Sequence, residues 1–493
     1  MTTFLLLAPI AVPLLGALLY LGARWRQATR WVSAVSATLM LAAAITLAVD
    51  VATSGPRTAL GGLLRADALT AFMLIVIGAV GLLATAATPA FLRGEIDGGR
   101  ATARTATRHS VLVQLFLAAM ALAVLAADLG VLWVAVEATT IVTAFLVGQR
   151  RTRHAVEAAW KYVVICSTGI ALALLGTFLL NYAAQHAPGT PGLDLAALTQ
   201  HAAGLDPGVT RIAIALLIIG FGTKAGLAPL HAWLPDAHSQ APAPVSALMS
   251  GVLLAVAFYA VLRVKVIADV VLGSDFARAL LLVMALASLL LAASLLLAQR
   301  DYKRMLAYSS IEHLALVAFG AAVGGPLAYA AILLHILGHG LVKGVLFLAA
   351  GRILQSEATS RIDAVRGLVA RQPVVAGCLG LGVLALIGLP PFSVFASELG
   401  IARTGFAGGL GWATAAVLAV VVVIAAALLG HTSRMLLGTA PEGPGAAPAP
   451  RPIPATLGLT LVTGLVASAV LGVTAGPLGS LLRLAAGTLT GAS

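Results

Sequence analysis

The sequence predicts an all-α polytopic membrane protein with about 14 transmembrane helices, organised around two interrupted helices. Hydrophobic residues make up 60% of the 493 residues and charged residues only 10%, whereas a soluble protein has roughly 25% charged residues. Apolar runs of about 20 residues, the length that crosses a bilayer, recur along the whole chain. Two of these runs are broken by prolines beside charged side chains, which is tolerated at membrane depth only inside protein or around water.

Composition also excludes several classes of protein. The formal net charge of +12 indicates basic loops beside a lipid bilayer rather than a nucleic-acid-binding surface. Cys166 and Cys378 lie in apolar runs without a CxxC motif or iron–sulfur spacing, so we expect no disulfide, no metal and no cofactor. Residues 1–26 lack a basic region before their apolar run, which predicts a first membrane helix rather than a cleaved signal peptide.

The expected helices are the apolar runs long enough to span the membrane. The seventh and the twelfth are the interrupted ones. The predicted spans are 3–22, 31–49, 68–92, 110–127, 129–148, 161–181, 210–240, 243–262, 276–298, 305–324, 326–351, 373–403, 411–436 and 455–476.

Arginine and lysine are distributed unequally between the loops. Most of the 30 such residues follow odd-numbered helices, so the positive-inside rule places those loops on the inner face and both termini on the outer face. The Pro/Ala-rich stretch 441–454 is then an inner-face linker of low complexity. The cations after odd-numbered helices are Arg24, Arg26, Arg30, Arg93, Arg100, Arg104, Arg108, Arg150, Arg151, Arg153, Lys161, Arg300, Lys303, Arg304, Arg352, Arg361, Arg366, Arg371, Arg434 and Arg451.

The first interrupted helix begins as an apolar helix over 212–222 and reaches Lys224 where hydrocarbon should continue. Proline removes a backbone donor and breaks a helix, and a lysine beside a break at membrane depth is a functional-site hypothesis by default. The prolines and polar residues that follow Lys224 are Pro229, His231, Pro235, Asp236, His238, Pro242 and Pro244.

The second interrupted helix breaks at residues 388–391, read GLPP, and carries Glu398 just beyond. It comes five helices after the first, and because five is odd the two run in opposite directions across the membrane. That arrangement is typical of an inverted repeat with a site at each break. The expected divisions are 1–109 for helices 1–3, 110–262 for helices 4–8, 276–436 for helices 9–13, and 437–493 for the linker and helix 14.

Ionisable residues inside the spans are few, and together they predict a proton relay. Glu137, near the middle of helix 5, is the expected ion-pair partner of Lys224; such a pair keeps both groups charged until it is broken. Three polar residues of helix 11 recur at i, i+4 and i+8, on one helical face. Both cations inside the spans are lysine, which can lose its proton when buried, whereas arginine effectively never does. The predicted relay residues are Glu137, Lys224, His335, His339, Lys343 and Glu398.

Six further residues are candidates for the relay or for support of the broken helix: His231, Asp236, His238, Glu312, His313 and Lys161. Purely structural roles remain open for these residues, and also for Lys224 and the polar face of helix 11. Glu312 and His313 fall in the first turns of helix 10, near the inner surface, as ordinary interfacial residues would. Lys161 opens helix 6, where it would snorkel. The two other histidines would cap the broken helix, Lys224 would be a structural ion-pair partner, and the helix 11 face would pack against carbonyls.

The segment around the first interrupted helix resembles a known protein family. The segment FGTKAGLAPLHAWLPDAHSQAPAPVSALMSG, residues 221–251, resembles the helix 7–8 signature of the antiporter-like subunits of respiratory complex I, the Mrp-type cation/proton antiporters and the membrane arms of energy-converting hydrogenases. The resemblance covers roughly helices 2 to 14 and implies that family's fold, with two inverted five-helix units. It also implies roles for Glu137 in helix 5, Lys224 in helix 7, Glu398 in helix 12 and the polar face of helix 11.

Within that family the chain looks most like the hydrogenase-4 component F type. The similar stretches are RDYKRMLAYSSIEHLALVAFG, HILGHGLVKGVLFLAAGRI and GLPPFSVFASELGI. The chain ends soon after helix 14, so we expect no long lateral helix of the kind found in the largest complex I subunit. One residue departs from the pattern: Ala255 stands where many relatives carry a lysine, so the relay across helix 8 needs water or histidine.

The resemblance implies a proton-translocating subunit of a redox-driven membrane complex, most similar to a hydrogenase-4-like one. The subunit would hold no redox centre itself. Its partners would be other membrane-arm subunits and, indirectly, peripheral iron–sulfur and hydrogenase subunits. Four alternatives stay open: a complex I subunit serving NADH–quinone oxidoreduction; an Mrp-type Na⁺/H⁺ antiporter subunit; a haem or quinone enzyme that uses His313, His335 and His339; and a structural scaffold, which Ala255 favours.

Overall fold

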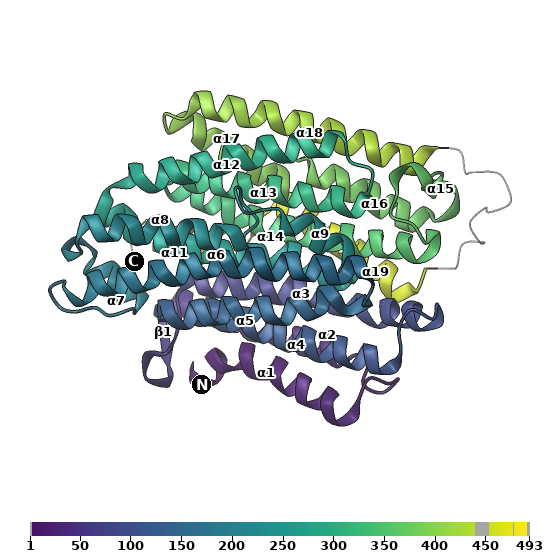
Figure 1. Ribbon diagram of the computed structural model, residues 1–493, viewed down its shortest axis with the longest axis horizontal. Helices are drawn as coiled ribbons and strands as arrows, with labels where there is room; N and C mark the ends of the chain where they lie inside the picture. Colours follow the sequence, from purple (N-terminus) through teal and green to yellow (C-terminus); the bar gives the residue numbers. More distant parts are fainter. Residues whose placement is uncertain (1, 439–452, 477, 491–493) are drawn as a thin grey trace.

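The computed structural model describes residues 2–438, 453–476 and 478–490 and confirms the predicted all-α membrane fold. Within these residues fourteen segments run along the bundle: thirteen helices long and apolar enough to cross a membrane, and a fourteenth broken into two shorter helices. The prediction for 441–454 lies mostly outside the described residues. Figure 1 shows the helices side by side, roughly along one axis.

The crossing segments agree with the predicted order. They are α1 (Thr2–Ala23), α2 (Val32–Ser54), α3 (Ala68–Asp97), α4 (Ala103–Leu125), α5 (Leu129–Val147), α6 (Arg153–Gln185), α8 (Pro207–Lys224), α10 (Ala243–Leu248) continued by α11 (Leu254–Leu272), α12 (Ser274–Leu297), α13 (Tyr302–Val323), α14 (Pro326–Glu357), α16 (Pro373–Leu386) with α17 (Ser393–Ala407), α18 (Gly411–Leu437) and α19 (Ala455–Val473).

Several short elements were not predicted, because they are too short or too polar to span a membrane. They are the antiparallel strands β1 (Arg57–Ala59) and β2 (Leu64–Ala66), α7 (Leu195–Gln200), α15 (Leu368–Arg371) and α20 (Leu478–Leu489). The short helix α9 (Trp233–Gln240), in contrast, is the second part of the predicted interrupted helix 210–240.

The bundle has two distinct ends. One end carries the β1–β2 hairpin, α7 and both chain termini, and we call it the hairpin face (Figure 1). The loops after odd-numbered spans, together with α15, lie at the other end, which we call the basic face. The cations that the sequence places in alternate loops are therefore gathered on one face of the fold.

Helix lengths differ from the prediction where polar residues extend an apolar run. The helix predicted over 161–181 is α6, which begins at Arg153. The Thr152 side chain caps it by accepting a hydrogen bond from the Ala155 N–H at 3.2 Å, and arginine and glutamate are good helix formers. Lys161 therefore lies two turns inside α6, and the prediction that it opens the helix was wrong.

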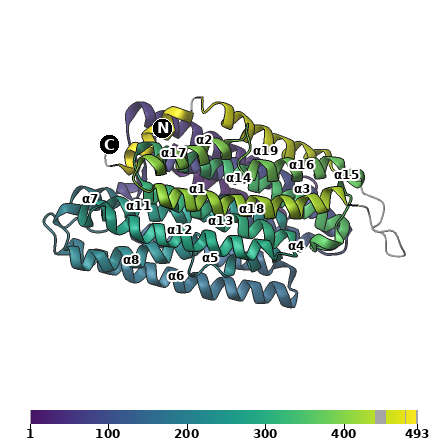
Figure 2. The ribbon, with the colours of Figure 1, turned by 90° about the horizontal axis from the view of Figure 1, so that it is seen from above.

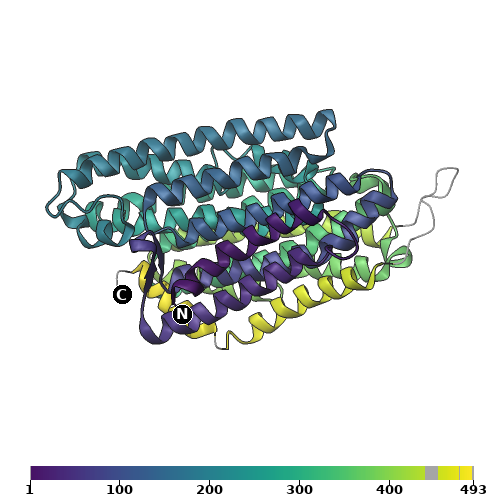
Figure 3. The ribbon, with the colours of Figure 1, turned by 90° about the horizontal axis from the view of Figure 1, so that it is seen from below.

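Burial divides the bundle into inner and outer helices. In the most apolar windows of α10–α11 and α13 every residue is buried, and 94% are in α14, against 33% in α18 and α19. Figures 2 and 3 place α6 at one lateral edge and α19 at the other, with α14 between them. At the centre Gly251 and Gly340 bring two backbones together: a Cβ on Gly251 would lie 3.0 Å from the Gly340 carbonyl oxygen. Small residues allow this close approach.

A buried ion pair joins α3 to α11 on the hairpin face. Arg263 Nη1 and Nη2 each lie 2.7 Å from an oxygen of Asp67, and Asp67 also caps α3 by accepting the Thr70 N–H at 2.9 Å. Burial raises the pKa of the Asp67 carboxyl, but the charge and hydrogen bonds of Arg263 outweigh burial and hold that pKa below its usual range. The carboxylate is therefore charged at neutral pH.

Asp67→Asn should destabilise the fold by about 3 kcal/mol, because asparagine still caps α3 but leaves the buried Arg263 without its counter-charge. The measurement is the thermal unfolding midpoint of the detergent-solubilised protein by tryptophan fluorescence. Since the Asp67 pKa is lowered, its stabilisation is present at neutral pH and is lost as pH falls through the folded-state pKa. The gap between wild type and variant should therefore narrow in acid.

The matched control is Asp50→Asn, which removes the partner of Arg57 in a more exposed pair and should leave the midpoint nearly unchanged. Equal shifts for both variants at neutral pH would contradict a special role for the α3–α11 pair.

Candidate functional site

Lys224 ends α8 in the middle of the bundle and is fully buried. Its Nζ donates hydrogen bonds to Thr140 Oγ1 at 2.7 Å and to Tyr162 Oη at 2.5 Å. The chain leaves the helix after Lys224 and resumes as α9, whose Trp233 Nε1 donates to the Thr223 carbonyl at 3.0 Å. A carbonyl freed by the break is thereby satisfied, as a buried helix end requires.

Glu137 does not contact Lys224 directly. One Glu137 oxygen accepts from Ser167 Oγ at 3.2 Å, and the other is buried without a partner. No oxygen of Glu137 lies within the 4 Å of Lys224 Nζ that defines an ion pair, so the predicted direct pair is not formed in this structure. The lysine is held by neutral hydroxyls, while the carboxylate faces a neighbouring helix with one oxygen free.

A polar cavity of about 240 Å³ opens on the basic face beside α9. Asp236 lies between two cations there: Lys161 Nζ at 3.1 Å and Arg304 Nη1 at 2.9 Å. Lys161 also pairs with Glu157 at 2.7 Å. The next residue in α6 is Tyr162, whose hydroxyl accepts the hydrogen bond from Lys224. Adjacent residues of α6 therefore contact the charged cavity and the buried lysine.

His238 in α9 is fully buried, and neither of its ring nitrogens has a hydrogen-bond partner. Its ring stacks on Phe347 of α14 with centroids 4.9 Å apart, one helical turn from Lys343. His231 is only half-buried, and α9 has no side-chain cap at its start. The predicted capping role of these two histidines was therefore wrong at the start of α9.

Lys343 of α14 is fully buried against α13. Its Nζ donates to the Leu306 carbonyl at 2.7 Å and to Ser309 Oγ at 2.5 Å. Lys303, a turn nearer the basic face, is also buried, with its Nζ donating to the carbonyls of Ser239 and Ala241 at 2.8 Å each. Like Lys224, both lysines are held by uncharged oxygens.

Three histidines and a carboxylate form a cluster between α13, α14 and α17. His313 Nδ1 and His335 Nε2 are 3.0 Å apart, and His335 Nδ1 and Ser397 Oγ are 2.9 Å apart. The His339 ring lies 4.9 Å from the His313 ring. Glu398 brings a carboxylate oxygen within 4.8 Å of ring nitrogens of His313 and His335. We call these four ionisable residues, His313, His335, His339 and Glu398, the histidine cluster.

The cluster corrects the prediction for helix 10. Glu312 and His313 are 3% and 0% exposed and lie halfway along α13, rather than in its first turns near the membrane surface. They are therefore not interfacial residues. The direct contact of His313 with His335 also leaves no space for a haem iron between these two nitrogens.

The hydroxyl groups of the site were missed from the sequence. Hydroxyls contact four of the charged or titratable side chains: Tyr162 and Thr140 at Lys224, Ser167 at Glu137, Ser309 at Lys343 and Ser397 at His335. These residue types are common in membrane helices, where they also bond to their own backbone, so composition does not single them out. Their spacing does carry a signal, because Thr140 follows Glu137 by three residues and Ser309 precedes Glu312 by three.

Comparison with known proteins gives consistent results. Residues 126–424 match the family described as NADH:quinone oxidoreductase/Mrp antiporter, TM. A hydrogenase-4 component F homolog of Methylacidiphilum infernorum (isolate V4) is 40% identical over 352 residues, 70% of this chain and 73% of that protein. NADH-quinone oxidoreductase subunit N of Desulforudis audaxviator (strain MP104C) is 33% identical over 364 residues, 72% of this chain and 68% of that protein.

Solved structures share the whole fold. A chain of the membrane-bound sulfane sulfur reductase, an archaeal respiratory membrane complex, superposes with a TM-score of 0.87 at 26% identity, covering 99% of this chain and 98% of that one. A chain of the Mrp complex from Dietzia sp. DQ12-45-1b gives a TM-score of 0.86 at 23% identity, covering 99% and 97%. The second likeness concerns the fold alone.

Gly388→Ala should disturb the second break. Gly388 has φ +70°, and a Cβ there would collide with a carboxylate oxygen of Glu398. The Glu398 side chain can move aside, but the positive φ remains and should lower stability by about 1–3 kcal/mol, measured as a lower thermal unfolding midpoint. Gly377→Ala in α16 is the control: a Cβ there meets open space, so the midpoint should stay or rise. Equal destabilisation by the two variants would show that the break has no special need for glycine at position 388.

Proposed function

Because this chain belongs to the NADH:quinone oxidoreductase/Mrp antiporter family, we propose that it translocates protons as an antiporter-like membrane subunit of a redox-driven complex, most similar to a hydrogenase-4-like one. The observation that carries the proposal is the series of buried ionisable side chains held by neutral oxygens. A buried lysine without a counter-charge is costly, and such intramembrane groups mark ion pathways.

Proton uptake is proposed at the polar cavity of the basic face. Asp236 and Lys161 collect protons there, and the Tyr162 hydroxyl links α6 to Lys224. A hydroxyl both donates and accepts a hydrogen bond, so Tyr162 and Thr140 can exchange a proton with the lysine without a second charge beside it. Lys224 is the first buried carrier.

The step across helix 8 is proposed to pass by His238 rather than by a lysine. Ala255 is buried two residues after the π-helical turn Met249–Leu253, and π-turns inside helices occur frequently at functional sites. Ser250 in this turn bonds Ser310 of α13 at 2.7 Å, beside Ser309 and Lys343. His238 has two free ring nitrogens and stacks on Phe347 of α14, which supports it as the titratable group between Lys224 and Lys343 in the proposed relay.

The last part of the relay is Lys343 followed by the histidine cluster. His339, His313 and His335 succeed one another at ring or hydrogen-bond distance, and Glu398 ends the series. Neutral imidazole accepts a proton at one nitrogen and donates from the other, so these contacts form a chain for proton exchange. The twofold division into residues 110–262 and 276–436 would then correspond to two half-channels.

Coupling is proposed to depend on Glu137. Its free oxygen is available to approach Lys224 in another state of the complex, and a charge brought close favours protonated lysine. Electron transfer elsewhere in the complex would make and break this pair. The basic face would be the inner face and both termini would be outside. The partners would be other membrane subunits and, through them, peripheral iron–sulfur and hydrogenase subunits.

Lys224→Ala and Glu137→Gln should each lower proton pumping by about 100-fold or more, in keeping with the loss of a proton-transfer group, and should leave assembly intact. The measurement is redox-driven acidification of proteoliposomes that contain the purified complex. Lys224→Arg separates two roles, because it keeps the positive charge but cannot release the proton. We expect it to fail as well, whereas retained pumping would reduce Lys224 to a structural cation.

Arg153→Ala, which removes one positive charge at the exposed start of α6, is the control and should pump normally. Normal pumping in either Lys224→Ala or Glu137→Gln would refute the proposed relay.

Gentle solubilisation and co-purification of the tagged native protein identifies the parent complex. We expect hydrogenase-like large and small subunits together with iron–sulfur proteins. NADH dehydrogenase subunits would instead indicate complex I. Small membrane partners alone would indicate an Mrp-type antiporter, and sodium-dependent proton flux in vesicles would then be the decisive assay.

A further inference from the structure

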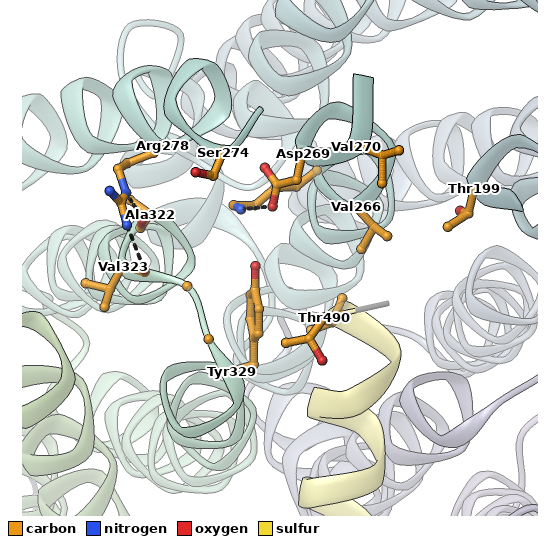
Figure 4. Close-up of a pocket in the computed structure, with 14 residues that line it drawn as sticks. Thr199, Val266, Asp269, Val270, Ser274, Arg278, Ala322, Val323, Tyr329 and Thr490 are labelled. Carbon is orange, nitrogen blue, oxygen red and sulfur yellow. Dashed lines mark hydrogen bonds and ion pairs between the residues drawn. The ribbon is translucent and has the colours of Figure 1, made fainter. Parts of the chain in front are cut away.

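We propose that a polar vestibule on the hairpin face is the mouth through which protons pass between the histidine cluster and that side of the membrane. The vestibule is a cavity of about 320 Å³ between α11, α12, the α13–α14 turn and α20. This inference deepens the proposed function and rests on it. The residues that define the vestibule are Lys265, Asp269, Ser274, Arg278, Tyr329 and Thr490 (Figure 4).

The vestibule has the charges that a proton mouth needs. Lys265, whose side chain is only 4% exposed, contacts Asp269 at 2.5 Å. The other Asp269 oxygen, Oδ1, is buried without any hydrogen-bond partner. A buried acceptor beside a cavity of this size is expected to bind water, since each water needs only about 10–15 Å³ of such space and two or more polar partners. The carboxylate therefore lies where water meets the interior of the bundle.

The wall of the vestibule is fixed by Arg278 and Tyr329. Arg278 donates to the carbonyls of Ala322 at 3.2 Å and Val323 at 3.4 Å, in the last turn of α13. Tyr329, in the first turn of α14, directs its hydroxyl toward the side of Asp269 in Figure 4, and Lys265 Nζ lies 5.9 Å from its ring centroid. Arg278 thus ties α12 to the end of α13, and Tyr329 adds a hydroxyl from α14 to the wall of the same cavity.

The vestibule lies above the histidine cluster. Six residues of α14 separate Tyr329 from His335, a rise of about 9 Å, and nine residues of α13 separate Ala322 from His313, about 13 Å. Between the two levels Gly320 packs against Ile332 so closely that a Cβ would collide with it. The proposed path therefore meets an apolar contact between α13 and α14 here, comparable to the hydrophobic constrictions of gated pores.

The alternative way out, past Glu398, is much less polar. The crevice beside Glu398 holds only about 20 Å³, room for a single water. Its other lining residues are apolar except Thr414, and they come from α13, α17 and α18, with α18 among the least buried helices. A charge that left Glu398 by this route would meet hydrocarbon, whereas a charge that reached the vestibule would meet Lys265, Asp269 and water.

The test is to fill the vestibule chemically after the protein has folded. Ser274→Cys places a thiol at the rim, and the two native cysteines are buried. Proteoliposomes of the complete complex are assayed for proton pumping before and after a membrane-impermeant cationic methanethiosulfonate, with labelling confirmed by mass. We expect modification to lower pumping by about tenfold, because a fixed positive charge in a narrow mouth opposes proton passage. The flux before labelling shows that the variant folds.

Ser54→Cys, an exposed thiol on the same face at the end of α2, is the matched control and should be labelled without loss of pumping. Unchanged pumping after complete labelling of Ser274→Cys would refute the proposal that the vestibule is the proton mouth, regardless of the pumping rate of Lys224→Ala. Retained pumping in Lys224→Ala would overturn the relay instead, so the two failures are distinguishable.

A second comparison needs no thiol. Asp269→Asn should lower pumping severalfold by removing the acceptor at the mouth, whereas Asp275→Asn, a carboxylate 96% exposed outside the cavity, should not. Equal rates in these two variants would count against the vestibule.

Discussion

The structure depends on keeping Lys224 at the end of a helix in the middle of the membrane. A lysine there loses its hydration, and the helix that carries it leaves backbone groups unpaired. Both demands are met by neighbours on other helices. Thr140 and Tyr162 bind the ammonium group, and Trp233 binds a freed carbonyl. The ammonium group of Lys224 can therefore be buried only because α5, α6 and α9 pack around the end of α8.

The same solution recurs in the other half of the bundle. Lys343 is also bound by a backbone carbonyl and a hydroxyl rather than by a carboxylate, and the histidines contact each other and Ser397. Neutral partners stabilise a charged group less than an ion pair does, so the protonated and neutral forms stay closer in free energy. This balance suits groups that must gain and lose a proton in each cycle.

The sequence predicted the number and order of crossing helices, because hydrophobic length is a strong physical constraint in a bilayer. It also predicted both interrupted helices and the burial of Lys224 and Lys343, but it placed Lys303 and Lys265, which are buried as well, in loops. Three features could not be predicted. Helix ends depended on caps such as Thr152, which a hydropathy count ignores, and this misplaced Lys161. The depth of His313 depended on where α13 begins. The position of Glu137 relative to Lys224 depended on side-chain orientation between two helices, which no pattern in a single helix encodes.

The backbone contact between Gly251 and Gly340 limits how this protein can move. Many transporters work by rocking one half of the molecule against the other around a central site. Here α14 and the π-helical turn Met249–Leu253 meet at backbone distance, with the Val80 side chain against both glycines, so sliding one backbone past the other would produce clashes. This contact favours changes in side chains, ordered water and the two interrupted segments over movement of α14 against that turn. Mechanical work on a partner subunit would have to pass through such local switches rather than through a tilt of the whole bundle.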